Sequence, residues 1–401
     1  MNFHKSQFIT FILFIFVLSA FGVPTSYAEK PIKIGLLGPF KMIQGVEIDE
    51  VANMAAEEIN TSGGILGRKV ELIKAETEAN PAKGKAAAER LLFRDNVDFI
   101  IGVHRSEVGL IVQPIIADAK KIFIATGTAV PKLSDNVKQD YARYKYFFRI
   151  FFGSDQMVKP MVNQVEDLTG TFGFKKIAII AEDAVWVEMM VNGVKKAFGD
   201  NVVVLERPST KAIDYSSEFA KVKSTGAEVI FTILSGNQTI PFVNQWNDMK
   251  VPALVTGMPI LAQGDKFWDQ TDGRAQSVMT WKHGVRAPIT DKTIPYWDKF
   301  TKKYGHEPVS YTNFSTYDAM YILKKAVEKA GTLDPDTLVK TIEDTEFVGV
   351  SGVIKFDERH SPTVGADFVP FTYVQWQDGK QYMVWPDKMK VRDMIKPPWM
   401  K

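Results

Sequence analysis

Short apolar runs alternate along the chain with longer segments whose apolar residues recur every three or four positions. The first four runs cover residues 32–37, 70–73, 97–101 and 122–125. Between the first two runs, Ile48, Val51, Ala52, Ala55 and Ile59 fall on one face of a helix. Near-continuous apolar strands separated by helices predict a parallel sheet that is covered on both faces.

A second series follows with similar spacing. Its apolar runs cover residues 177–180, 202–205, 229–233 and 253–255, and residues 187–198 have helical periodicity between the first two. We therefore expect an α/β protein with two doubly wound lobes, joined first through an extended segment at 146–152. Ligands of such folds bind outside the carboxyl ends of the strands.

The remainder of the chain completes the two lobes rather than starting a third. After one strand at 277–281, helices are predicted at 294–304, 313–330 and 336–342, and strands at 352–356, 368–377 and 381–384, with Asp378-Gly379 as the last hairpin turn. The predicted division is 29–149 plus 282–346 for the first lobe, 150–281 plus 347–390 for the second, and 391–401 for a C-terminal tail. The chain would then cross between lobes three times, forming a three-segment hinge.

The N-terminus has the pattern of an export signal. Lys5 precedes an apolar run over 8–23, and Pro24 leads to Ser26-Tyr27-Ala28. A short apolar run before a small-residue site predicts a signal peptide over 1–28, cleaved after Ala28. The alternative is an uncleaved anchor, but a membrane-spanning helix needs about 20 apolar residues. We expect a periplasmic protein.

Composition excludes several classes of protein. The chain has 401 residues, 49 basic and 47 acidic side chains, and a formal net charge of +2, so no basic field is available for nucleic acid. It has no cysteine, which excludes disulfides, thiolate zinc sites and a lipidated cysteine. Four histidines beyond the signal segment, at 104, 283, 306 and 360, have no metal-binding spacing. We expect no metal.

The motifs of common enzymes are absent as well. No segment has the Walker phosphate loop. Gly35-Leu-Leu-Gly38-Pro39 lacks the spacing of a dinucleotide site, and Pro39 has no amide to donate. Gly349-Val-Ser-Gly352 is one residue short of a hydrolase nucleophile elbow. We predict neither enzymatic activity nor a cofactor.

Polar residues follow the third and fourth strands of the first lobe. Arg105 and Ser106 end the loop after the third strand and open a helix, so Ser106 is a predicted N-cap whose hydroxyl and neighbouring amides can face an anion. The plainer alternative is that Ser106 only caps its own helix. Thr126, Gly127 and Thr128 follow the fourth strand and let a ligand approach the backbone. Together these residues predict a carboxylate site.

The second lobe offers a tryptophan and neutral amides at its strand ends. Trp186 lies six residues beyond its first apolar run, where its ring can cover an organic ligand or instead pack against a helix. The turn after its third strand contains Asn237 and Gln238, which can donate or accept hydrogen bonds.

Four segments carry a resemblance to a known family. They are IKIGLLGPF at 32–40, AEEIN at 56–60, GGILGRKVEL at 63–72 and STYDA at 315–319. With the signal peptide, their order and spacing resemble the type I periplasmic solute-binding proteins of ABC importers, in the branched-chain amino acid (leucine/isoleucine/valine-binding) family. The resemblance implies a monomeric Venus-flytrap receptor that closes on a small solute and delivers it to an inner-membrane permease. A sensory ligand-binding receptor is the alternative.

The resemblance also implies roles for individual residues. Ser106 and Thr128 match the family's carboxylate-binding hydroxyls, Gln44 stands where an aromatic residue is common, and Trp186 stands at the usual tyrosine. Gln238, or Asn237 beside it, replaces the acid that binds an α-ammonium group.

This departure from the family pattern bears on the solute. Glu182 or Asp183 could supply the missing charge. Otherwise the ligand is an amide or aromatic acid without an ammonium, because a buried ammonium without a charge partner is costly.

Overall fold

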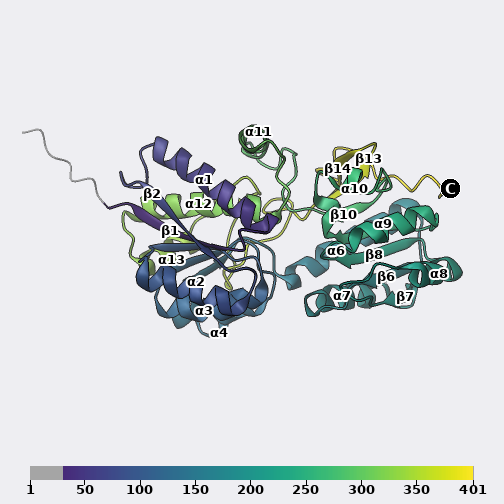
Figure 1. The fold of residues 1–401 in the computed structure, drawn as a ribbon, viewed down its shortest axis with the longest axis horizontal. Coiled ribbons are helices and arrows are strands. Elements are labelled where there is room, and N and C mark those ends of the chain that lie inside the picture. The colour runs from purple at the N-terminus through teal and green to yellow at the C-terminus, as the bar shows by residue number, and fades with distance from the viewer. Residues whose placement is uncertain (1–29, 401) are drawn as a thin grey trace, which may run out of the picture.

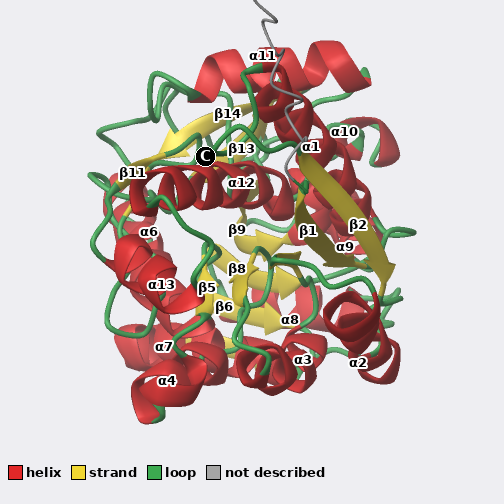
Figure 2. Ribbon diagram, turned by 90° about the vertical axis from the view of Figure 1, so that its left-hand side faces the viewer, coloured by secondary structure: helices red, strands yellow, loops and turns green. Residues whose placement is uncertain are grey.

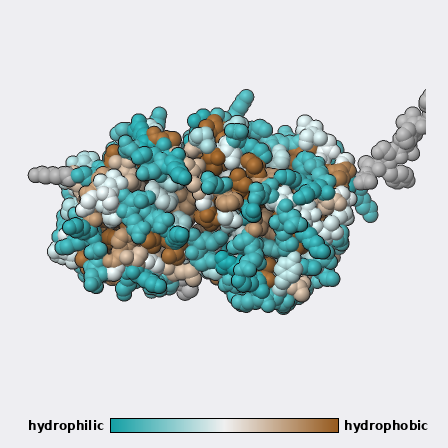
Figure 3. Space-filling model, turned by 180° about the vertical axis from the view of Figure 1, so that it is seen from behind, coloured by the Kyte–Doolittle hydropathy of each residue, from teal (hydrophilic) through white to brown (hydrophobic). Residues whose placement is uncertain are grey.

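Two lobes lie side by side along the long axis of the molecule (Figure 1). This computed structural model describes residues 30–400, so the predicted signal peptide and its cleavage site lie outside the described residues. Over residues 30–400, no helix is both long and apolar enough to span a bilayer. Hydrophilic residues predominate on the face in Figure 3, and hydrophobic ones form small groups, several near the middle of the long axis.

The first lobe contains a five-stranded parallel sheet in the order β2-β1-β3-β4-β5. Its strands are β1 (Ile32–Gly38), β2 (Val70–Glu76), β3 (Phe99–Gly102), β4 (Ile122–Ala125) and β5 (Phe147–Arg149). The first four confirm the predicted strands, and β5 lies within the segment predicted to be extended. Ile34 and Leu36 point to one face of the sheet and Leu37 to the other, as the two-residue period of a strand requires.

Helices cover both faces of this sheet (Figure 2). They are α1 (Ile43–Thr61), α2 (Pro81–Glu89), α3 (Ser106–Asp118), α4 (Lys132–Gln139), α5 (Tyr141–Tyr144), α12 (Tyr311–Ala330) and α13 (Pro335–Glu343), with a π-helical turn η1 (Arg90–Arg94). A further helix, α11 (Thr293–Tyr304), packs on α1 and α12 rather than on the sheet. Helices α1, α12 and α13 share one apolar core, and α2, α3 and α4 share the other. Two of the predicted helices after residue 282, α12 and α13, therefore pack in the same core as this sheet.

Helix α3 is continuous although Pro114 lies inside it. Proline removes a single backbone hydrogen bond. The buried side chains of Val112 and Ile116, on either side of Pro114, hold the helix against the sheet.

The second lobe repeats the architecture with four parallel strands in the order β7-β6-β8-β9. The strands are β6 (Ile177–Ala181), β7 (Val202–Glu206), β8 (Val229–Leu234) and β9 (Leu254–Pro259). The helices are α6 (Ser154–Phe172), α7 (Glu188–Phe198), α8 (Ser216–Thr225), α9 (Thr239–Asp248) and α10 (Phe267–Gln270), with short turns η2 (Val185–Val187), η3 (Gly199–Asn201) and η4 (Ile260–Gln263). Helices α6 and α7 pack on one face and α8 and α9 on the other.

The C-terminal part of the chain forms two small antiparallel sheets. One contains β10 (Met279–Trp281), β13 (Tyr373–Gln377) and β14 (Lys380–Trp385), with the predicted turn at Asp378-Gly379, and lies beside β9. The other pairs β11 (Phe347–Val348) with β12 (Val353–Ile354). Beyond β14, Trp399 packs on Trp246 and donates to the Val251 carbonyl, so the predicted tail lies on the second lobe.

The residues after α13 stay with the first lobe. Ser351 donates to the Asp318 carboxylate of α12, and the His360 carbonyl accepts from the Arg149 amide of β5. Ser361 and Ser134 share a hydrogen bond of 2.7 Å. These contacts differ from the lobe boundary at 346 that periodicity predicted, and we propose that the third crossing follows residue 361.

Aromatic side chains from all three crossings pack together between the lobes. We call this group the hinge cluster; it consists of Phe151, Phe152, Trp281, His283 and Phe371. The Phe152 ring lies 5.3 Å from His283 and 5.6 Å from Phe371, and all the cluster's rings are buried. The crossings therefore form one packed unit.

Gly102 at the end of β3 provides a test of the backbone geometry that precedes Ser106. Its φ is +128°, and a Cβ there would lie 2.3 Å from the Leu37 carbonyl oxygen. We expect Gly102→Ala to lower the free energy of unfolding by at least ~1–3 kcal/mol, the usual cost of such strain. Gly170→Ala in α6, where a Cβ meets nothing within 4 Å, is the control and should be neutral or stabilising. Equal melting temperatures for the two variants in calorimetry would contradict this account.

Candidate functional site

The first-lobe half of the predicted site is built on the loops that follow β3 and β4. Arg105 occupies the N-cap position of α3 without a side-chain cap, so Ser106 is not the N-cap that the sequence predicts. Instead, the Ser106 Oγ accepts from the amides of Ala129, at 3.3 Å, and Val130, at 3.2 Å. Ser106 therefore fixes the loop after β4, and its hydroxyl proton remains available to an acceptor.

Thr126 and Thr128 are both fully buried at the end of β4. Neither hydroxyl oxygen has a hydrogen-bond partner among the described residues. Gly127 between them lies close to α12, because a Cβ there would be 2.9 Å from the Thr312 Cγ2. The loop thus holds two unsatisfied hydroxyls, and an unsatisfied buried polar group costs free energy until it finds a partner.

Gln44 lies at the start of α1, beside the same loop. Its carbonyl accepts from the Thr312 Oγ1 at 2.8 Å, which joins α1 to α12. Its side-chain Oε1 is buried and, over the described part of the chain, has no partner. Gln44 and Gly127 therefore both lie next to Thr312, which is consistent with Gln44 belonging to the same half-site as the loop after β4.

Arg105 and its neighbour His104 point in different directions. Arg105 is exposed, and its Nε lies 3.4 Å from Glu107. The His104 Nδ1 shares a 2.6 Å hydrogen bond with the Tyr311 hydroxyl, and Tyr311 stacks on Phe151 at 4.5 Å. Burial lowers the pKa of His104 to about 4, so the ring is neutral at neutral pH. Sequence reasoning missed this contact, because its two residues are 207 positions apart.

The buried carboxylate of Glu182, just after β6, organises the second-lobe half of the site. Its Oε1 accepts from the Trp186 Nε1 at 3.0 Å, and its Oε2 accepts from the Gln238 Nε2 at 2.6 Å. The backbone amide and hydroxyl of Ser235 also donate to Oε2, at 2.8 and 2.9 Å. Glu182 thus joins Trp186 and Gln238, which the sequence proposed separately, and adds Ser235 to them.

The remaining polar groups of this half are more exposed. Asn237 lies at the surface and contributes its carbonyl to the turn before α9. The Asp183 side chain is 76% exposed, with its Oδ1 4.0 Å from Arg207. Of the two acids that could replace the missing charge, Glu182 is already hydrogen-bonded by four donors and Asp183 is solvated.

The two halves form independently of each other. Within residues 30–400, no hydrogen bond or ion pair joins a candidate residue of one lobe to a candidate residue of the other. Nor do these residues contain a group of three acidic or histidine side chains that could hold a metal ion. The arrangement provides hydroxyls and an amide on one side, and a tryptophan with a buried carboxylate on the other, which suits binding of a small polar molecule.

Comparison with known proteins finds one matching family and relatives with related descriptions. The sequence profile of a family described as periplasmic binding protein matches residues 31–380. The Leu/Ile/Val-binding protein homolog 7 of Brucella suis biovar 1 is 23% identical over 383 residues, covering 92% of this chain and 95% of the relative.

Solved structures share the fold at low sequence identity. The branched-chain amino acid transporter substrate-binding protein of Streptococcus pneumoniae, in complex with isoleucine, has a TM-score of 0.74 at 18% identity, covering 92% of this chain and 100% of that chain. A solute-binding protein of R. palustris in complex with benzoate has a TM-score of 0.71 at 18% identity, covering 92% and 99%. The predicted fold class is confirmed.

Glu47 positions the first-lobe half by joining α1 to the start of α12. Its buried carboxylate accepts from the amides of Val309, at 2.8 Å, and Ser310, at 2.5 Å, just before Tyr311 and Thr312. Burial raises the pKa of Glu47 from 4.5 to about 7, although the two amides oppose this shift.

The raised pKa predicts a pH-dependent stability. The folded state holds a proton on Glu47 that the unfolded chain has released, so the contribution of Glu47 is largest below pH 4.5 and falls by up to about 3 kcal/mol as the pH rises through 7. Glu47→Gln should remove this decline, so its melting temperature should fall less than that of the unmodified protein between pH 5 and 8. Parallel melting curves across this range would contradict the assignment.

Proposed function

This chain belongs to the periplasmic binding protein family, whose members are non-enzymatic transport components, and we propose that it is the solute-binding subunit of an ABC importer. Its solute is a small carboxylate-bearing molecule captured between the lobes. The observation that carries this proposal is that each lobe has its own half-site, while the lobes are joined by a packed three-segment hinge. Closure about such a hinge brings the two half-sites onto one ligand.

The first-lobe half supports a carboxylate. Thr126 and Thr128 have hydroxyls without partners among residues 30–400, and the Ser106 hydroxyl retains its proton for donation. Hydrogen bonds from such groups to a carboxylate contribute about 1.5–3 kcal/mol each. Isoleucine and benzoate, the ligands of the two solved structures, share a carboxylate and differ in the ammonium.

The second-lobe half favours a solute without an α-ammonium group. The Glu182 carboxylate accepts four hydrogen bonds from its own lobe, so an ammonium would have to displace Gln238 or Ser235 to reach it. Trp186 presents a partly exposed indole whose Nε1 is fixed by Glu182. An aromatic carboxylic acid satisfies both conditions, and an amino acid such as leucine is the second candidate because of the relatives named above.

The location and partners follow from the same proposal. A signal peptide cleaved after Ala28 would release the mature protein into the periplasm as a monomer. There it would deliver its solute to an inner-membrane permease, without nucleic acid, metal or cofactor.

Thr128→Ala tests the carboxylate site. Loss of one charge-assisted hydrogen bond should weaken benzoate binding about 10- to 100-fold in calorimetry, and Ser106→Ala should act in the same direction. Thr210→Ala, at an exposed position of the second lobe, is the control and should leave the affinity unchanged. Unchanged affinity in both site variants would reject the carboxylate site.

Trp186→Ala tests the preference for a flat solute. Loss of the indole should weaken benzoate binding more than leucine binding, because only an aromatic ligand gains from ring contacts. Trp186→Phe keeps a ring but loses the Nε1 hydrogen bond to Glu182, and should retain most of the affinity. Equal losses for benzoate and leucine in Trp186→Ala would assign Trp186 to packing alone.

A further inference from the structure

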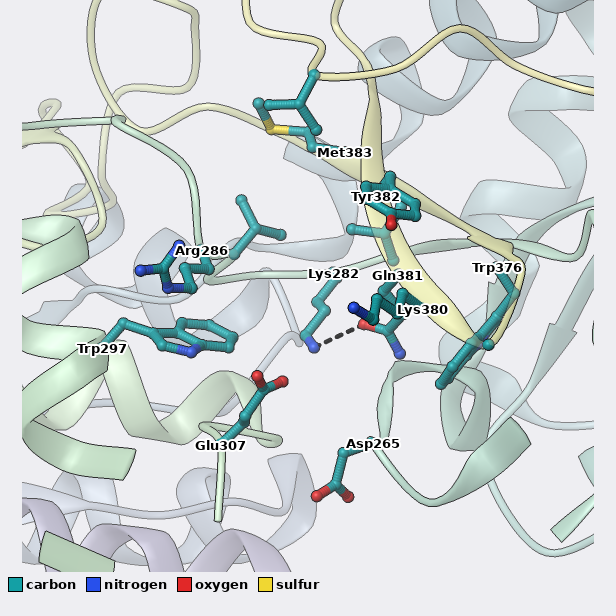
Figure 4. A pocket seen from close by; sticks show the side chains of 14 residues that line it. Asp265, Lys282, Arg286, Trp297, Glu307, Trp376, Lys380, Gln381, Tyr382 and Met383 are labelled. Carbon is teal, nitrogen blue, oxygen red and sulfur yellow. Dashed lines mark hydrogen bonds between the residues drawn. The ribbon is translucent and has the colours of Figure 1, made fainter. Parts of the chain in front are cut away.

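A cavity of about 580 Å³ lies between α11 of the first lobe and the β13–β14 hairpin of the second (Figure 4). Trp297 lines it from α11, and Trp376 and Tyr382 line it from the hairpin. None of the nine residues predicted for the strand-end site lines this cavity. It is therefore separate from the site described above, although both lobes contribute to each.

Lys282, immediately after β10, places an ammonium group in this cavity although the residue is only 4% exposed. Its Nζ donates to the Gln381 Oε1 at 2.8 Å and lies 5.6 Å from the centre of the Trp297 ring. An ammonium has three N–H donors, and Gln381 is the only hydrogen-bond acceptor found among the described residues. No carboxylate of the described chain lies within ion-pair distance of it.

Two exposed carboxylates line the same cavity. Glu307 precedes α12 and Asp265 follows η4, and neither side chain makes a hydrogen bond or ion pair within residues 30–400. Figure 4 shows the Glu307 carboxylate directed toward the space beside Lys282. Arg286, in contrast, is neutralised by Asp298 through contacts of 3.0 and 3.2 Å.

Burial opposes the charge of Lys282, whereas the surrounding acids favour it. Desolvation lowers the pKa of Lys282 to about 8, and the charges of Glu307, Glu47 and Asp265 oppose this change. The amine therefore remains mostly protonated at neutral pH. A buried cation without an ionic partner is costly, and a bound carboxylate would supply that partner.

We propose that this cavity is a second binding site that takes a small zwitterion with an aromatic side chain. Lys282 binds its carboxylate, Glu307 or Asp265 binds its ammonium, and the aromatic ring packs among Trp297, Trp376 and Tyr382. A molecule of this kind gives the buried Lys282 an anionic partner and an exposed carboxylate of the cavity a cationic one, which neither a simple anion nor a simple cation does. Because the walls come from both lobes, its occupancy would also bias the angle between them.

L-phenylalanine is the probe, with phenylacetate and phenethylamine as comparators that each lack one charge. In calorimetry and saturation-transfer NMR on Thr128→Ala, which impairs the strand-end site, phenylalanine should still bind, and each comparator should bind at least about tenfold more weakly. Adding Lys282→Met should weaken phenylalanine binding by at least about tenfold. Adding Lys388→Met, which removes an exposed lysine that does not line the cavity, should leave it unchanged.

Lys282→Met removes a desolvated charge and keeps a long side chain in its place, and Glu307→Gln gives an independent variant that should also weaken phenylalanine binding. Phenylalanine affinity that is unaffected by both Lys282→Met and Glu307→Gln would overturn the proposal. So would its loss in Thr128→Ala alone, or the absence of binding at millimolar concentration. None of these outcomes rejects the strand-end site, which is tested separately with benzoate.

Discussion

The packing of aromatic rings from three separate chain crossings is the contact on which ligand binding between the lobes depends. Phe152, Trp281 and Phe371 come from different crossings and lie within 6.4 Å of one another, ring centre to ring centre. Rings of this size bury much apolar surface and prefer defined geometries. The cluster therefore holds the two lobes together. Within residues 30–400 the candidate residues at their strand ends make no hydrogen bond or ion pair across the lobes, and a ligand can bridge them.

The two strand-end half-sites are prepared for a ligand in different ways. In the first lobe, the hydroxyls of Thr126 and Thr128 have no hydrogen-bond partner in the described part of the chain, so a ligand that binds them would remove an existing free-energy cost. In the second lobe, Glu182 is already satisfied and holds Trp186 and Gln238 in place. The cavity at Lys282 resembles the first-lobe half-site in one respect. Its buried ammonium group has no ionic partner among the described residues, and a bound carboxylate would supply one.

Periodicity was enough to predict both sheets, because apolar runs and helical faces are local properties of the chain. It also identified the loops of the candidate site, since strand ends in a parallel sheet meet at one edge. It could not predict that Ser106 binds the amides of residues 129 and 130, or that His104 meets Tyr311, because these contacts depend on tertiary packing. From the sequence, Lys282 looks like an ordinary surface lysine. Its contact with the hairpin of residues 373–385 comes from residues about 100 positions away, so the sequence gives no local signal of its burial.

Small-angle X-ray scattering of the mature chain, with and without saturating benzoate, tests the central claim that this molecule binds its solute by closing two lobes. The account predicts a smaller radius of gyration in the bound state and a return to the original value after dialysis. An unchanged radius of gyration at a benzoate concentration that saturates binding in calorimetry would contradict capture between the lobes.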